Sequence, residues 1–224
     1  MNRVDETGLG DTSDRGPWMQ TYSGRAFFLL NPRTTDVETV DLAHHLALQC
    51  RFAGATIKPY SVAQHCVLVS HIVPKPYAIY GLMHDAAEAY CQDMTRPMKL
   101  ALQRMGDDEF LNIESDALGC IFARYGIDYS LYLQIRDVIK HADNIACATE
   151  ARDLLHRSER PWGKMEDPLP TKLKAWSWKR AKQEWLRRFN ELLPHGRVVT
   201  PAPIEPRPLR YGAFGVPAFA RSEL

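Results

Sequence analysis

The sequence has no long hydrophobic run and almost no excess of either charge. None of its 224 positions begins a stretch of about 18 apolar residues, so we expect no transmembrane helix. The first twenty residues hold no apolar segment of the kind that a secretory signal needs. Lysine and arginine number 28 and aspartate and glutamate 27, which argues against a broadly basic nucleic-acid-binding protein. These absences favour a cytoplasmic protein without membrane contact.

Cysteine and glycine patterns exclude several further classes of site. The five cysteines are Cys50, Cys66, Cys91, Cys120 and Cys147, an odd number without a C-x-x-C pair. Neither a disulfide framework nor a structural zinc knuckle is therefore expected, and we predict reduced, mostly buried thiols. The sequence also lacks the glycine-rich loops of dinucleotide-binding and P-loop proteins and the G-x-S-x-G turn of serine hydrolases.

What is present is helical periodicity. Residues 1–16 lack any period and predict a flexible leader, while prolines recur through residues 194–224 and predict an irregular tail. Residues 17–193 predict one all-α domain that begins with a short β-hairpin around Ser23-Gly24. Helices are expected at about 37–48, from Ser61 onward, and at 76–90, 108–125, 130–155 and 172–193.

Histidines and carboxylates gather on three of these helices. His84 and Asp85 are adjacent in an apolar segment, where burying both is costly unless something pairs with them. Glu88 follows His84 by four residues and is expected on the same helical face. His65 and Asp143 stand on an earlier and a later helix; His65 alone would more simply be a core histidine. Two imidazoles and two carboxylates suit one divalent transition ion, whether Mn²⁺, Co²⁺, Fe²⁺, Ni²⁺ or Zn²⁺.

In this order the residues resemble the H…HD…D signature of the HD-domain metal-dependent phosphohydrolases. Arg51 lies fourteen residues before His65, Glu88 is the third residue after the His-Asp pair, and Asp93 precedes Met94-Thr95-Arg96-Pro97. This pattern of residues is similar to that of the 5′-deoxynucleotidase branch and of related short phage deoxynucleoside triphosphohydrolases. The resemblance covers residues 18–155 and implies an HD-type helical bundle over the 17–193 domain. The metal ligands it implies are His65, His84, Asp85 and Asp143.

The resemblance also implies roles for the surrounding residues. Glu88, Arg51 and Asp93 would be catalytic, and Arg51 and Asp93 would also contact the substrate. Arg96 and Lys99 would bind further phosphates, although a solvated pair on a short helix is an equal alternative. For Asp93 the alternative is a helix N-cap. His141 is two residues from Asp143 and would point away from it, so one ion is expected rather than two.

The implied activity is hydrolysis of the 5′-phosphate ester of a deoxynucleotide, by a homo-oligomer. A monophosphate would give nucleoside and phosphate, and the alternative is a dNTP triphosphohydrolase that releases triphosphate. A different class is an RNA-binding or nucleotide-sensing protein without catalysis, because residues 172–188 carry seven cations against Glu184 alone, interleaved with tryptophan. The stripe of Trp178, Trp185 and Phe189 instead favours burial of that helix, with its cations in solvent.

Overall fold

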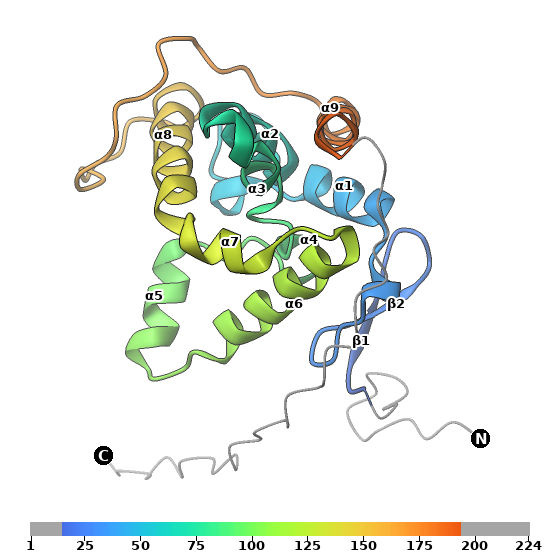
Figure 1. Ribbon diagram of the computed structural model, residues 1–224. Coiled ribbons are helices and arrows are strands. Elements are labelled where there is room, and N and C mark those ends of the chain that lie inside the picture. The colour runs from blue at the N-terminus through green and yellow to red at the C-terminus, as the bar shows by residue number, and fades with distance from the viewer. Residues whose placement is uncertain (1–14, 194–224) are drawn as a thin grey trace, which may run out of the picture.

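Helices build most of the protein, in agreement with the predicted class (Figure 1). The structure is a computed structural model and describes residues 15–193. The predicted tail, 194–224, and all but the last two residues of the predicted leader lie outside the described residues. The α-helices are α1 Thr39–Leu48, α2 Val62–Ile72, α3 Ala78–Met83, α4 Glu88–Cys91, α5 Arg96–Arg104, α6 Glu109–Tyr125, α7 Tyr129–Gln134, α8 Arg136–Leu154 and α9 Trp178–Leu192. Short 3₁₀ turns are η1 Thr34–Asp36, η2 Arg51–Gly54 and η3 Lys75–Tyr77.

The predicted hairpin is confirmed, with short strands. Strand β1 (Trp18–Gln20) pairs antiparallel with β2 (Ala26–Phe28). Ser23 in the turn donates its backbone N–H and its hydroxyl to the buried carboxylate of Asp41 in α1, at 2.7 and 2.8 Å. These charge-assisted bonds fix the hairpin against the helical body.

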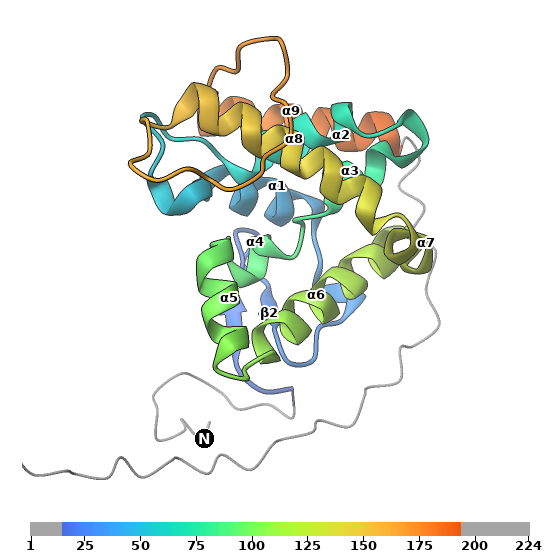
Figure 2. The ribbon, with the colours of Figure 1, turned by 90° about the vertical axis from the view of Figure 1, so that its left-hand side faces the viewer.

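Helix α2 lies at the centre of the bundle and packs against α1, α3, α8 and α9. Its residues from Val62 to Val67 are all buried, which is typical of a helix covered on every side. In Figure 2, α1, α2, α3, α8 and α9 form one layer, and α4, α5 and α6 lie beneath it with the hairpin.

The helix predicted over 76–90 is wrong in one respect, because it is broken at the His-Asp pair. Helix α3 ends at Met83 and α4 begins at Glu88, with i→i+3 backbone bonds between them. In a continuous helix the carbonyl of Gly81 would accept the N–H of Asp85. Here it accepts from Nδ1 of His84 at 2.9 Å, so a side chain competes with the helix for that carbonyl.

Two other predicted helices also differ from the structure. The segment 130–155 is divided into α7 and α8, because the backbone turns at the buried Ile135. The last helix begins at Trp178, since the Ser177 hydroxyl caps it by accepting the N–H of Arg180. Residues 172–177 are extended instead, and Gln64 binds their backbone at Lys174 O and Trp176 N, at 2.8 and 2.7 Å.

The stripe predicted for the last helix is confirmed only in part. Trp185 and Phe189 are buried, but the Trp178 side chain is 43% exposed. Arg188, predicted among the solvated cations, is buried. All five cysteines are free, with Cys66 and Cys120 buried and Cys50 exposed. Between residues 15 and 193 no helix combines the length and apolarity that crossing a bilayer requires.

Candidate metal centre

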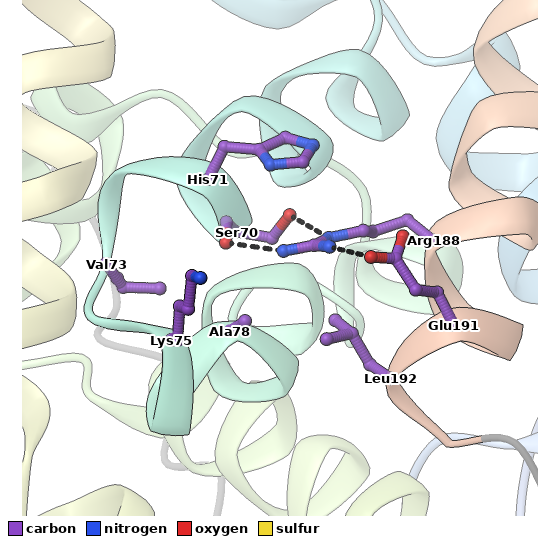
Figure 3. A pocket seen from close by; sticks show the side chains of 8 residues that line it. All are labelled: Ser70, His71, Val73, Lys75, Ala78, Arg188, Glu191 and Leu192. Carbon is purple, nitrogen blue, oxygen red and sulfur yellow. Dashed lines mark hydrogen bonds and ion pairs between the residues drawn. The ribbon is translucent and has the colours of Figure 1, made fainter.

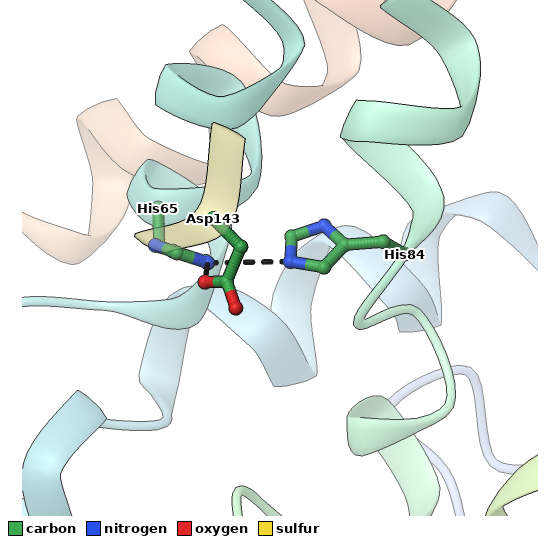
Figure 4. A group of neighbouring side chains, drawn as sticks. All are labelled: His65, His84 and Asp143. Carbon is green, nitrogen blue, oxygen red and sulfur yellow. Dashed lines mark hydrogen bonds and ion pairs between the residues drawn. The ribbon is translucent and has the colours of Figure 1, made fainter. Parts of the chain in front are cut away.

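Three separate segments bring the four predicted ligands together. His65 comes from α2, Asp143 from α8 and His84 from the turn after α3 (Figure 4). Asp85 follows His84 in the same turn. Nε2 of His65 lies 3.3 Å from Nε2 of His84 and 3.2 Å from Oδ1 of Asp143. Oδ2 of Asp85 lies 3.5 Å from the His65 nitrogen and 3.2 Å from the His84 nitrogen. Ligands about 2.1 Å from one transition ion stand about 3.0–3.4 Å apart, so these spacings fit a single ion.

The second nitrogen of each imidazole decides which way its lone pair points. Nδ1 of His65 lies 2.6 Å from Oε1 of Glu150, and Nδ1 of His84 lies 2.9 Å from the Gly81 carbonyl. Because both partners are acceptors, each Nδ1 carries a proton, and in the neutral form of each ring the Nε2 lone pair points toward the other histidine. The ligand atoms of His65, His84 and Asp143 lie within 4.8 Å of one another, and an oxygen of Asp85 lies beside both histidines. Nitrogen and oxygen donors grouped in this way could hold a cation.

The carboxylates also act on the protonation of His65. Burial and Arg51 lower the pKa of His65, but Glu150 and Asp143 outweigh them and raise it to about 9. Burial raises the pKa of Asp143, yet its bond to His65 holds it far below the ordinary value. In the absence of a metal, His65 is therefore protonated, and its positive charge partly neutralises the neighbouring carboxylates. A cation would compete with that proton, so metal affinity is expected to weaken in acid.

Glu150 is a site residue that the sequence reasoning missed. Its fully buried carboxylate accepts from His65 Nδ1, from the Tyr60 hydroxyl at 2.9 Å and from Arg51 Nε at 3.1 Å. Burial opposes its ionisation, but Arg51 and His65 outweigh this and lower the pKa of Glu150 to about 2. Tyr60 is fully buried in this contact and belongs to the core.

Arg51 reaches into the same cluster from η2. Its backbone N–H donates to the Tyr60 carbonyl at 2.9 Å, which fixes where the side chain starts. Its Nη1 lies 3.6 Å from Asp85 and its Nη2 4.0 Å from Asp143. Both distances exceed hydrogen-bond length, so the two Nη groups face the cluster while remaining able to donate to another anion. Phe52, the next residue, has a left-handed backbone with φ 56°.

Glu88 lies buried at the start of α4, beside the cluster. Within the described part of the chain its Oε2 has no hydrogen-bond partner. Burial, followed by the charges of Asp85 and Asp93, raises the pKa of Glu88 well above the ordinary value. Gln49 binds the Glu88 carbonyl at 2.8 Å and accepts the N–H of Asp93 at 3.2 Å. A buried carboxyl without a partner is a common feature of a site that handles protons or water.

The remaining predicted residues are less closely placed. Burial raises the pKa of Asp93, and the charges of Arg51 and Asp85 also act on it, so its carboxyl belongs to this neighbourhood. The N-cap of α5 is Thr95, so the alternative of Asp93 as that cap is wrong. Lys99 is held by both oxygens of Glu114, at 2.8 and 2.9 Å. Arg96 is exposed at the first position of α5.

Two further candidate ligands do not join the centre. His141 is exposed and lies 3.3 Å from a carboxylate oxygen of Glu166, as expected of a residue that points away from Asp143. The Cys66 thiol lies within reach of His84 and Asp85. Burial raises the pKa of Cys66, so a proton would compete with a cation for this thiol, and Cys66 is not counted among the four candidate ligands.

Comparison with known proteins adds two relatives. The chain is 39% identical to YfdR of Escherichia coli over 137 residues, which are 61% of this chain and 72% of that protein. The chain belongs to the family of YfdR. A Rhodobacter capsulatus protein is 30% identical over 151 residues, covering 63% of this chain and 75% of the relative. Both relatives are named as uncharacterized proteins, and no family model matches the chain.

Proposed function

We propose that this member of the YfdR family is an HD-type, metal-dependent phosphohydrolase that cleaves the 5′-phosphate ester of deoxynucleoside monophosphates. The observation that carries the proposal is the gathering of His65, His84, Asp85 and Asp143, in which Nε2 of His65 lies 3.2–3.5 Å from a ligand atom of each of the other three. An unpartnered buried carboxyl and an arginine with two available Nη groups adjoin them. Together these groups supply the ligands, the proton carrier and the anion clamp that phosphate ester hydrolysis needs.

Each residue has a distinct part in the proposed reaction. A bound divalent ion would supply a more acidic water and would shield the charge of the phosphate. The Nη groups of Arg51 would bind a non-bridging phosphate oxygen, while its Nε stays bonded to Glu150. Glu88 would position the attacking water, or deliver a proton to the 5′ oxygen that leaves. Asp93, tied to Glu88 through Gln49, would contact the sugar or share in that proton transfer.

The surroundings of Lys99 and Arg96 bear on the length of the phosphate chain. A triphosphate needs cations beyond the one that holds its first phosphate. Lys99 is engaged by Glu114, and Arg96 is exposed. This supports a monophosphate as the substrate, and triphosphate hydrolysis stays the alternative that the same assay distinguishes by its product.

The test is an assay of deoxynucleoside and ribonucleoside monophosphates and dNTPs, with Mn²⁺ or Co²⁺, for nucleoside, phosphate and triphosphate. We expect Asp85→Asn to weaken Co²⁺ binding and to lose activity. Glu88→Gln should retain Co²⁺ and lose about 100-fold or more in kcat, as for removal of a general acid or base. Asp137→Asn and Glu159→Gln remove exposed carboxylates and serve as matched controls. The proposal is wrong if no nucleotide is hydrolysed, or if Glu88→Gln is as active as its control.

A further inference from the structure

A cavity of about 470 Å³ lies away from the candidate metal centre, at the C-terminal end of α2 (Figure 3). It is enclosed by the C-terminal end of α2, by η3 with the start of α3, and by the last turns of α9. The size is within the range of small-molecule sites, which is about 300–1,000 Å³. The residues that line it are Ser70, His71, Val73, Lys75, Ala78, Arg188, Glu191 and Leu192.

The most unusual group in its wall is the buried guanidinium of Arg188. Its Nε donates to the Ser70 hydroxyl at 3.1 Å, its Nη2 to the Ser70 carbonyl at 3.1 Å, and its Nη1 to Glu191 at 2.8 Å. Among the described residues these contacts use three of the five N–H donors that a guanidinium has. Two donors therefore remain, on a side chain whose position is already fixed.

A second cation faces Arg188 across the cavity. Lys75 extends from η3 and Arg188 enters from α9, and Figure 3 shows both side chains directed toward Ser70. Lys75 stands between Pro74 and Pro76, whose rings restrict the backbone that presents it. Glu191 is half exposed and already paired, so it offsets only part of this charge. The cavity is therefore a positively charged site with a restrained framework.

The remaining wall is aliphatic. Val73, Ala78 and Leu192 line it, and Val73 and Ala78 are buried. A free inorganic ion would leave most of the volume unfilled, whereas an organic group on the anion would contact these side chains. Lys75 and Arg188 outweigh the charge of Glu191 and therefore favour an anion, and the arginine fork matches phosphate oxygens. We propose that this cavity is a second binding site, separate from the metal centre, for a small organic molecule that carries a phosphate monoester.

This site is connected to the metal centre through one close contact. A Cβ atom added to Gly81 would lie 3.0 Å from the Ser70 Cα and 2.9 Å from a methyl carbon of Val73, so α2 and α3 approach closely there. Ser70 is the residue that Arg188 holds, and the Gly81 carbonyl is the one that orients His84. A ligand bound between Lys75 and Arg188 is thus two contacts away from a metal ligand. The binding proposal does not depend on the proposed activity.

The test is a titration of the full-length chain, loaded with Zn²⁺. Two-dimensional NMR of backbone amides and arginine Nε–H groups monitors the titration. The probes are phenylphosphonate, which has a dianionic head on an apolar ring and no hydrolysable ester, and inorganic phosphate. Benzoate, which has the ring but a carboxylate, is the third arm. We expect saturable shifts at Ser70, Gly81 and Arg188, with phenylphosphonate binding more tightly than either other probe.

Exposed Lys75 can be changed without disturbing the buried Arg188 contacts. We expect Lys75→Gln to raise the Kd for phenylphosphonate about fivefold, as for the loss of one partly exposed ion pair. Lys179→Gln removes an exposed lysine outside the cavity and should leave that Kd unchanged. The proposal is overturned if the Ser70 and Arg188 signals do not saturate, or if the two lysine variants weaken binding equally. Tightest binding of benzoate would overturn the assignment to phosphate.

Discussion

The carboxylate of Glu150 provides the sharpest test of how the metal centre is held together. It is fully buried and accepts from His65, Tyr60 and Arg51. Its pKa falls from the ordinary 4.5 to about 2 on folding. At about 1.36 kcal/mol per pKa unit, this corresponds to about 3 kcal/mol of stability for the ionised form. Glu150→Gln keeps the shape but removes the charge, and its amide NH₂ must face at least one donor.

We therefore expect Glu150→Gln to lower the free energy of unfolding by about 3 kcal/mol at pH 7, measured by urea denaturation with a chelator present. Because the folded-state pKa is the lower one, the contribution of Glu150 is complete above pH 4.5 and is lost as the pH falls toward 2. The variant should lack this part of the acid sensitivity. Its affinity for Co²⁺ should fall about 10- to 100-fold, because His65 loses the partner that orients it.

The exposed Glu159 supplies the matched control, since Glu159→Gln should change neither quantity. The reasoning would be refuted by a Glu150→Gln variant that stays within about 1 kcal/mol of the parent at pH 7 and binds Co²⁺ with the parent's affinity. Stability lost without a change in Co²⁺ affinity would show that Glu150 supports the fold but does not orient His65.

Three other predictions concern packing and metal binding. Gly81→Ala should destabilise by about 1–3 kcal/mol in urea denaturation, because its Cβ would lie 2.9 Å from Val73, whereas Gly119→Ala, with open space, should stabilise by about 0.5–1 kcal/mol. Equal changes in stability for the two glycine variants would contradict the close approach of α2 and α3 at Gly81. Trp185→Ala should cost about 3–5 kcal/mol and the exposed Trp178→Ala under about 1 kcal/mol, checked by the same method. Co²⁺ at a hundred times its Kd should raise stability by about 2.7 kcal/mol, and an unchanged melting temperature would argue against a site in the folded state.

The break at His84 shows why periodicity predicted the fold better than the details of the site. Apolar spacing continues through the pair, so a single helix over 76–90 was the natural prediction. At this break the His84 ring binds the Gly81 carbonyl, which in a continuous helix would accept the N–H of Asp85. A side chain can reach that carbonyl from a helix or from a turn, and the sequence pattern does not distinguish the two. The candidate ligands could be named from the sequence, but the backbone that presents them could not be predicted.

The sequence indicates only weakly that Glu150 is a site residue. It lies seven residues after Asp143, about two helical turns, and therefore on the same side of α8. The buried stripe of that helix includes Ile139, Ala142 and Ala146, and Glu150 continues it four residues on. A carboxylate within a buried stripe signals a buried partner. One partner of Glu150 is Arg51, which lies 99 residues away in the sequence. Only the three-dimensional structure shows that the two residues meet.

The net charge of the buried cluster around His65 favours the binding of a cation. Arg51 contributes one positive charge, and Asp85, Asp143 and Glu150 contribute three negative ones, which leaves two negative charges when both histidines are neutral. Burying a net charge of that size costs several kcal/mol per ion unless something compensates it. A divalent cation would supply two positive charges at the point where the Nε2 lone pairs meet. The carboxylates that make this cluster costly to bury beside neutral histidines are therefore the ones that would favour a divalent ion there.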